Sequence, residues 1–299
     1  MKSANGREEP LLKRKLKIIA GIFLIVAVAF LIFAWHEGSV LISPSNGEIG
    51  PPPTDLPVQS VQFPSASGAT LRGWFIPGQR GKGVIILMHG IRANRAQMTG
   101  LAGFLFRAGY SVFLFDFQAH GESIGKHITA GHLESLDAIA AVDFVRQKSP
   151  AEKIGIIGFS MGGASALLAD PPLRVNALVL ESVYPTIQQA ITDRLENRFG
   201  WFGKFGTPFL TWQLKLRLGF SPDDLCPIKE VGHITVPKLF IAGTADLETR
   251  VQESKDLFNA AAEPKQLWLV DGAGHVDIHA LHPRDYEKRI LDFFGENLN

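Results

Sequence analysis

The residues Gly158-Phe159-Ser160-Met161-Gly162 match the pattern G-x-S-x-G. An apolar run precedes the motif and small residues follow it, so the sequence predicts a strand over 154–159 and a helix over 161–169 with a sharp turn between them. Glycine at both flanking positions permits the close backbone approach that such a strained turn needs. Ser160 Oγ is then expected to project above a sheet, beside the positive end of a helix, as a candidate nucleophile.

A serine hydroxyl needs a nearby base that accepts its proton and returns it to the leaving group. Of the nine histidines, His275 is the candidate, because it follows the last expected strand in the loop Asp271-Gly272-Ala273-Gly274-His275 and comes after the serine in the chain. His89 and His120 also follow strands but precede the serine. We expect those two to brace loops.

A base of this kind is oriented by an acid that falls between serine and histidine in the chain. Asp246 is the best candidate, because it closely follows the strand expected at 238–242. It would accept the Nδ1 proton of His275 and stabilise the imidazolium. Glu181, at the end of the preceding strand, is the rival acid, and Asp271 is a weaker one because it lies so close to His275 in sequence.

Acyl transfer also requires hydrogen-bond donors for the oxyanion that develops on the substrate. The backbone N–H of Met161, directly after the candidate nucleophile, is one expected donor. The loop His89-Gly90-Ile91 after the first parallel strand supplies the other, which we assign to the N–H of Ile91.

Metal chemistry is the alternative for the same region. His275, His279 and His282 with Asp277 permit a metal site by residue type. However, His275 is already assigned as the base, and the other two histidines are expected on a surface helix.

Cys226 is the single cysteine, which excludes an internal disulfide and any site with several cysteine ligands. We expect it to be a small buried residue. Neither a metal ion nor an organic cofactor is implied.

The elements that must position these residues follow an alternating pattern. Strands are expected at 58–63, 71–76, 84–88, 111–115, 154–159, 177–180, 238–242 and 266–270, and helices at 96–107, 133–148, 161–169, 252–262 and 284–294. The first two strands flank Ser67-Gly68 and form an antiparallel hairpin. The remainder predicts an α/β fold, a mainly parallel sheet with helices on both faces, whose ligands bind at the carboxyl ends of the strands.

A cap insertion is expected at about 183–236, where no strand pattern occurs. Within it, the segment 199–220 holds seven aromatic residues in 22, with Lys204, Lys215 and Arg217 among them. Such a cap suits the membrane surface and a lipid-like acyl substrate. An ordinary helical lid whose aromatic residues pack on the domain beneath is equally consistent with the pattern.

The N-terminal region predicts a membrane anchor. Residues 18–35 carry no charge, and as a helix they would span about 27 Å, close to the thickness of the bilayer core. A cluster of Lys and Arg precedes them and none follows until Arg72. The positive-inside rule therefore places a basic tail, 1–17, in the cytoplasm and the globular part outside it. A semi-extended linker is expected over 36–57.

Two alternatives exist for this anchor. Ala27-Val28-Ala29 resembles the cleavage site of a signal peptide, but the apolar run continues beyond it. A buried core helix would show a polar face, and this run has none.

Residues 1–17 carry a local charge of +4 in a chain of net charge +1, which leaves −3 on the rest. A mildly acidic body argues against nucleic acid as a partner.

Five segments together resemble the α/β-hydrolase superfamily over residues 58–297: LMHG (87–90), FDFQAHGES (115–123), GFSMGG (158–163), AGTAD (242–246) and GAGH (272–275). The resemblance is greatest to its membrane-anchored serine hydrolases, which include esterases, lipases, thioesterases and some peptidases. It implies a triad of Ser160, Asp246 and His275 with Ile91 and Met161 in the oxyanion hole. Gln118-Ala119 stands where many relatives have Arg-Gly, a departure that touches a structural turn.

The sequence thus predicts a hydrolase of carboxylic esters that forms an acyl-enzyme on Ser160. A thioesterase or a peptidase with the same triad is the alternative, since the acyl-transfer chemistry is shared. A catalytically inactive binding module would ordinarily have lost a member of the triad, and none is lost here. The expected partners are a small or lipid-like acyl substrate and the membrane.

Overall fold

Eight strands form one sheet in the computed structural model, which describes residues 8–298. In spatial order they are β10 (Lys265–Val270), β9 (Lys238–Gly243), β8 (Ala177–Glu181), β7 (Ile154–Phe159), β4 (Val84–Met88), β5 (Ser111–Phe115), β3 (Thr70–Ile76) and β2 (Gln59–Pro64). Strand β3 runs opposite to the other seven, so its pairings with β2 and β5 are antiparallel and the rest of the sheet is parallel. The expected hairpin and the mainly parallel sheet are both confirmed.

Helices cover both faces of this sheet. On one face lie α2 (Thr99–Arg107) and α10 (Pro283–Leu298), and on the other lie α3 (His132–Lys148), α4 (Met161–Leu167) and α8 (Val251–Ala260). Strand β4 shows why its sequence is apolar throughout. Ile85 and Leu87 pack toward α2 and α10, whereas Ile86 and Met88 pack toward α3 and α4, so every side chain of the strand is buried.

The start of α4 lies directly against the ends of the central strands. A Cβ atom on Gly162 would lie 2.3 Å from the carbonyl oxygen of Met88 at the end of β4. One on Gly158 would lie 2.6 Å from Gly163 of the same turn. Glycine is therefore required here for space, because the strand and the helix meet backbone to backbone.

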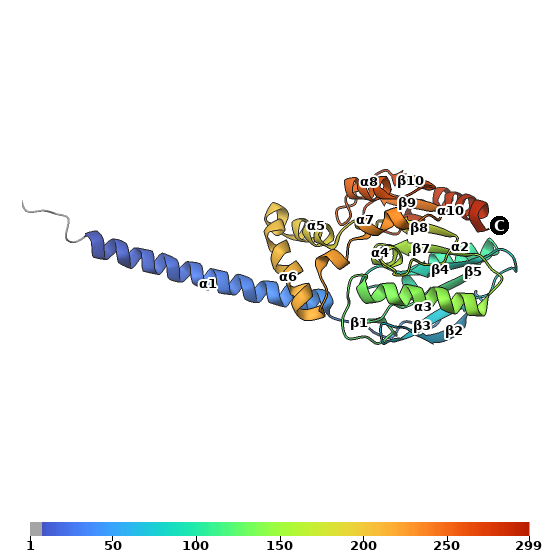
Figure 1. Cartoon of the computed structure of the whole chain (residues 1–299), viewed down its shortest axis with the longest axis horizontal. Helices are drawn as coiled ribbons and strands as arrows, with labels where there is room; N and C mark the ends of the chain where they lie inside the picture. Colours follow the sequence, from blue (N-terminus) through green and yellow to red (C-terminus); the bar gives the residue numbers. More distant parts are fainter. Residues whose placement is uncertain (1–7, 299) are drawn as a thin grey trace, which may run out of the picture.

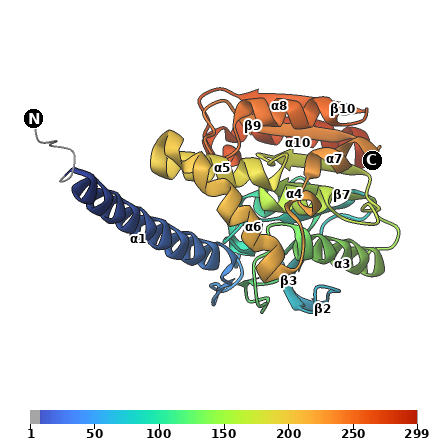
Figure 2. The ribbon, with the colours of Figure 1, turned by 60° about the vertical axis from the view of Figure 1, so that its left-hand side comes forward.

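The segment between β8 and β9 is a helical cap, as predicted for about 183–236. It comprises α5 (Ile187–Phe199), η3 (Gly200–Gly206), α6 (Thr207–Leu218), η4 (Pro222–Asp224), α7 (Pro227–Glu230) and η5 (Val231–His233). Smaller elements are β1 (Ser45–Asn46) paired with β6 (His120–Gly121), η2 (Arg95–Met98) and α9 (Ile278–Leu281). Helices α5 and α6 stand at the side of the body from which the N-terminal helix leaves (Figure 2).

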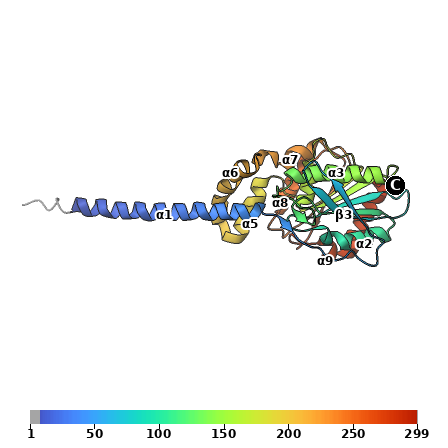
Figure 3. The ribbon, with the colours of Figure 1, turned by 90° about the horizontal axis from the view of Figure 1, so that it is seen from below.

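That N-terminal helix, α1 (Glu8–Ile42), projects from the body as one long rod (Figures 1 and 3). Its part Lys13–Ile42 is long and apolar enough to cross a membrane, and almost all of its most apolar stretch is exposed. It contains the predicted segment 18–35. Of the predicted basic tail, 1–17, the first seven residues lie outside the described part of the chain.

The helix extends beyond the predicted anchor. It runs to Ile42, so the first seven residues of the predicted linker, 36–57, are helical. Packing against the cap explains the difference: Arg198 Nη1 forms an ion pair with Glu37 Oε2 at 2.9 Å, and Arg217 Nη1 donates to Ser39 Oγ at 2.7 Å. Such contacts stabilise a helical end that local sequence alone does not favour.

The close contact at α4 gives a test of the fold. Gly162→Ala is expected to lower the free energy of unfolding by about 1–3 kcal/mol, because the added methyl group meets a backbone carbonyl that cannot move without the sheet. The matched control is Gly47→Ala, where a Cβ meets nothing within 4 Å, and it should stay within about 0.5 kcal/mol of the wild type. Unfolding of the full chain in detergent, followed by circular dichroism, measures both. Equal stability of the two variants would contradict this packing.

Candidate active site

Ser160 occupies a strained turn between β7 and α4. Its backbone has φ 49° and ψ −115°, in the positive-φ region that a residue with a side chain rarely adopts. The turn is held on both sides, because Ser160 N donates to Glu181 O at 2.8 Å and Ala164 N donates to Ser160 O at 3.0 Å. The sharp strand-to-helix turn predicted from G-x-S-x-G is therefore present.

Asp246 and His275 meet across neighbouring loops at the carboxyl ends of β9 and β10. His275 Nδ1 donates to Asp246 Oδ2 at 2.8 Å. The other carboxylate oxygen of Asp246 accepts the backbone N–H groups of Glu248 at 2.8 Å and Thr249 at 2.9 Å. Both oxygens are thus fixed, and the carboxylate sets the tautomer in which Nε2 of His275 is free to accept a proton.

The surroundings of Asp246 keep it charged. Burial by itself raises the pKa of this carboxyl, but the hydrogen bond and charge interaction with His275, together with the two backbone donors, outweigh it. The net result is that the pKa of Asp246 lies below its ordinary value. An ionised carboxylate is what an orienting acid needs in order to stabilise an imidazolium.

Ser160 and His275 line one cavity, together with Ile91 and Met161. Within the described chain, no hydrogen bond joins Ser160 Oγ to His275, a contact that often tightens only when substrate binds. The backbone N–H groups of Ile91 and Met161 likewise donate to no group among residues 8–298. Met161 is the first residue of α4, so its N–H has no partner inside the helix and is open to an oxyanion.

The two rival acids are placed elsewhere. Glu181 is fully buried and accepts a hydrogen bond from the hydroxyl of Tyr286, and burial raises the pKa of Glu181 to about 7. Asp271 accepts from Thr244 Oγ1 at 3.1 Å at the surface. Of the three candidate acids, Asp246 is the one that the structure brings to His275.

His89 and His120 brace loops, as expected. His89 Nε2 accepts the backbone N–H of Phe117 at 3.1 Å, and its Nδ1 donates to Gly90 O at 2.8 Å. Burial lowers the pKa of His89 to about 3, so this imidazole is neutral and ties the loop after β4 to the loop after β5. His120 Nδ1 donates to Gln118 O at 2.9 Å in the same region.

The departure at Gln118-Ala119 is accommodated in that turn. Ala119 has a φ of 58°, and the Gln118 side-chain amide donates to His127 O at 2.7 Å and to Glu134 Oε1 at 2.8 Å. A neutral side chain thus ties the turn to helix α3. The turn lies beside the site and supplies none of its reacting groups.

The metal interpretation gains no support from the geometry. His279 Nε2 pairs with Glu287 Oε1 at 3.0 Å between α9 and α10. Across residues 8–298, no group of three or more His, Cys, Asp or Glu side chains is arranged to hold a metal ion.

Cys226 is buried, which confirms the small buried residue expected there.

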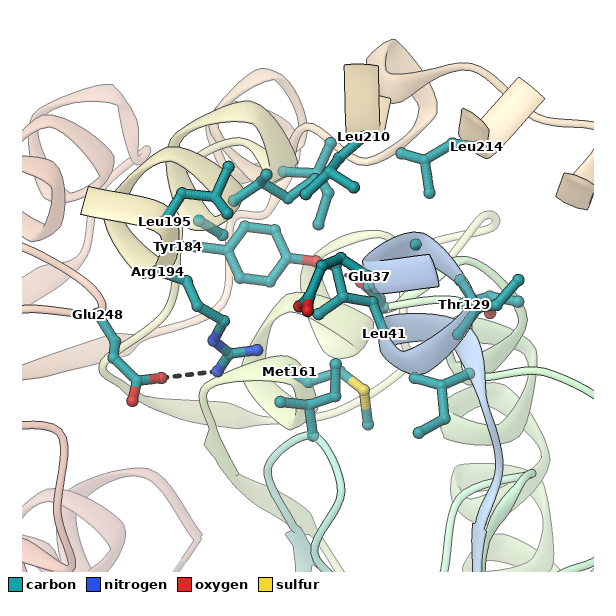
Figure 4. Close-up of a pocket in the computed structure, with 18 of the residues that line it drawn as sticks. Glu37, Leu41, Thr129, Met161, Tyr184, Arg194, Leu195, Leu210, Leu214 and Glu248 are labelled. Carbon is teal, nitrogen blue, oxygen red and sulfur yellow. Dashed lines mark hydrogen bonds and ion pairs between the residues drawn. The ribbon is translucent and has the colours of Figure 1, made fainter. Parts of the chain in front are cut away.

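The cavity above Ser160 is mostly apolar, and the sequence did not predict all of its walls. Leucines of α5 and α6 line it, and Tyr184 and Arg194 point into it, the latter paired with Glu248 at 2.7 Å (Figure 4). Leu41 and its neighbours at the end of α1 form another wall. The sequence carries only a permissive sign of this wall: no proline occurs between Pro10 and Pro44, so nothing forbids the helix from continuing past residue 35, although nothing in the local sequence requires it.

The chain is similar in sequence to several known proteins. A family model described as serine aminopeptidase, S33 matches residues 79–218. The chain is 28% identical to protein YfhR of Escherichia coli, over 97% of this chain and 98% of that one. It is 26% identical to the alpha/beta hydrolase domain-containing protein WAV2 of Arabidopsis thaliana, over 90% and 91%.

Among solved structures, the Pyrococcus furiosus esterase Pf2001 superposes with a TM-score of 0.71 at 24% identity. The superposition covers 86% of this chain and all of that one. With its sheet order, its turn at Ser160 and its helical cap, the chain has the α/β-hydrolase fold.

The buried Glu181 makes stability depend on pH. Its pKa is about 7 in the folded state and about 4.5 when unfolded, so the folded state binds more protons between these values. The stability that this group contributes is complete below about pH 4.5 and is lost as the pH rises through 7. Glu181→Gln, which keeps an acceptor for Tyr286, should therefore stabilise the protein by about 2–3 kcal/mol at pH 8 and change little at pH 4.5.

Unfolding midpoints of wild type and Glu181→Gln across this pH range measure the effect. The exposed Glu296 on the same helix as Tyr286 supplies the control, and Glu296→Gln should show no such pH-dependent gain. A constant offset between Glu181→Gln and wild type at all pH values would contradict the raised pKa.

Proposed function

We propose that this chain is a membrane-tethered serine hydrolase that cleaves carboxylic esters through an acyl-enzyme on Ser160. The observation that carries the proposal is the 2.8 Å pairing of His275 with Asp246 beside the cavity that His275 shares with Ser160. The strained turn at Ser160 supports it, because such strain clusters where a side chain must be presented for reaction.

In the proposed reaction, Ser160 Oγ attacks the ester carbonyl while His275 Nε2 takes its proton, and Asp246 stabilises the resulting imidazolium. The backbone N–H groups of Ile91 and Met161 hold the oxyanion of the tetrahedral intermediate. Collapse breaks the ester bond, and the alcohol leaves with the proton from His275. Water, deprotonated by His275, then attacks the acyl-enzyme and releases the carboxylic acid and Ser160.

The lining of the cavity favours an ester over a peptide. The family model's description points to an aminopeptidase, which must recognise a substrate's charged amino group. The acidic side chains of this cavity, Glu37 and Glu248, are both paired with arginines, Arg198 and Arg194, so neither is a free partner for an ammonium group. An apolar acyl group fits the remaining leucine-rich walls, and a thioester of the same acyl group is the second candidate because the acyl half is identical.

The proposed topology follows from charge. Lys13, Arg14, Lys15 and Lys17 precede the apolar part of α1, and none of the residues 18–71 is Lys or Arg. The proposal therefore keeps α1 as an uncleaved single-pass anchor, with the N-terminus in the cytoplasm and the catalytic body on the other side of the membrane.

The role of the acid is tested by two carboxamide variants. Asp246→Asn should lower ester turnover by about 10⁴, because an amide facing Nδ1 favours the wrong tautomer of His275. Glu181→Gln should cost less than about tenfold, because Glu181 does not contact His275. Turnover of a p-nitrophenyl ester by folded, purified full chain measures both, with Ser160→Ala as the inactive reference. The opposite ranking would assign the role of the orienting acid to Glu181. Unchanged turnover in Ser160→Ala would show that Ser160 is not the nucleophile.

A further inference from the structure

Resting on the hydrolase function proposed above, we infer that the substrate is an acyl lipid resident in the membrane. The lipid reaches Ser160 beside the C-terminal end of α1 while the cap docks on the same membrane surface. The docking surface, called the cap edge, comprises Phe199, Trp201, Phe202, Phe205, Phe209, Trp212 and Leu216, all exposed.

The first step is that helix α1 contains the candidate membrane span and also lines the cavity. Glu37, Gly38, Leu41 and Ile42, at the end of the candidate membrane span, line the cavity that holds Ser160. At Gly38 the approach of the cap is so close that a Cβ atom would lie 2.3 Å from the side-chain oxygen of Gln213. A wall of the cavity is therefore continuous with the membrane helix, without an intervening linker.

The second step is that the cap touches α1 inside the segment expected to lie in the bilayer. The rings of Phe209 and Phe30 are 4.9 Å apart, and those of Phe199 and Phe33 are 6.0 Å apart. Phe30 lies five residues before Trp35, or about 8 Å along a helix. With Trp35 at the outer boundary of the apolar segment, the cap edge reaches the depth of about 5–10 Å typical of interfacial helices.

The third step is the exposure of the cap edge. Trp201 is 59% exposed, Phe202 63%, Phe205 57% and Trp212 64%. These four belong to η3 and α6, which contact each other, and α6 also lies against the end of α1 (Figures 1 and 2). A contiguous apolar surface of this kind marks an interaction site, and tryptophan is favoured where a bilayer meets water.

Charge supports a lipid surface as the occupant. Lys204 Nζ lies 5.5 Å from the rings of both Trp201 and Phe205, and the Arg217 guanidinium lies 3.8 Å from the ring of Trp35. Basic groups beside interfacial aromatic rings match the anionic headgroups of a membrane. Because the cap edge is continuous with a helix that itself suits the bilayer, the bilayer and not a second protein is the occupant that we assign.

The chemistry follows the proposed mechanism. The acyl chain of the lipid enters the leucine-lined cavity along α1, which brings its ester carbonyl to Ser160 while the polar part stays at the headgroup level. Attack transfers the acyl group to Ser160 and releases the lipid alcohol, and water then releases the fatty acid. The long chain never has to cross bulk water, which is the advantage of a site built onto an anchor.

The test compares two esters in one preparation. The full chain is reconstituted in vesicles of phosphatidylcholine and phosphatidylglycerol that contain a fluorogenic acyl lipid, and turnover of this lipid is divided by turnover of water-soluble p-nitrophenyl butyrate. The triple variant Trp201→Ser, Phe202→Ser, Phe205→Ser should lower this ratio by at least about tenfold, because it removes apolar area that holds the cap in the interface.

The control is Leu281→Ser, on α9 and 53% exposed, which removes an apolar side chain away from the cap and should leave the ratio unchanged. An unchanged ratio in the triple variant would overturn the inference. Turnover of the soluble ester by the wild type without any turnover of the lipid would overturn it as well, while leaving the hydrolase function in place.

A second measurement does not depend on activity. In a Trp35→Phe background with Ser160→Ala, brominated phosphatidylcholine should quench the fluorescence of Trp201 and Trp212, and the further change of both to Phe should remove that quenching. Trp74 is buried and serves as an internal unquenched reference. Absence of quenching would overturn docking of the cap edge. Quenching in this background, combined with no hydrolysis of either ester by the wild type, would instead reject the hydrolase function, and the lipid substrate with it.

Discussion

The positive φ at Ser160 is the constraint on which the surrounding structure depends. A serine adopts this backbone conformation only where its neighbours enforce it. Here the enforcement comes from a fully buried strand before it, from the carbonyl of Glu181 that accepts its N–H, and from Gly158 and Gly163, which let α4 approach that strand. The same turn leaves the N–H of Met161 without a helical partner. One local conformation thus presents both a hydroxyl and an unpaired backbone N–H to the cavity.

Two buried carboxyl groups near this turn have opposite surroundings. Asp246 meets an imidazole and two backbone N–H groups, which outweigh burial and lower its pKa. Glu181, one strand closer to Ser160, meets only the Tyr286 hydroxyl as a donor, and burial raises its pKa. Below its pKa of about 7, Glu181 is mostly neutral and adds little negative charge beside Ser160. Environment, more than residue type, separates the proposed orienting acid from the buried carboxyl group beside it.

Much of this arrangement is predictable from the sequence because it depends on local patterns. Apolar runs predicted the strands to within a residue or two, and the chain order of Ser160, Asp246 and His275, each after the end of a strand, indicated the candidate site. The continuation of α1 to Ile42 was not predictable, because Gly38 and Ser39 disfavour a helix locally and contacts with Arg198, Gln213 and Arg217 stabilise it. Those partners lie more than 150 residues away in the chain, beyond what any local pattern reports.

The central claim is that Ser160 is an activated nucleophile. The most direct measurement is to treat the folded full chain with a fluorophosphonate, which reacts with activated serine hydroxyls, and to locate the labelled peptide by mass spectrometry. The account predicts a single modification at Ser160 that is lost in His275→Ala, because the proton of the hydroxyl then has no acceptor. Labelling at another serine, or equal labelling of Ser160 without His275, would contradict it.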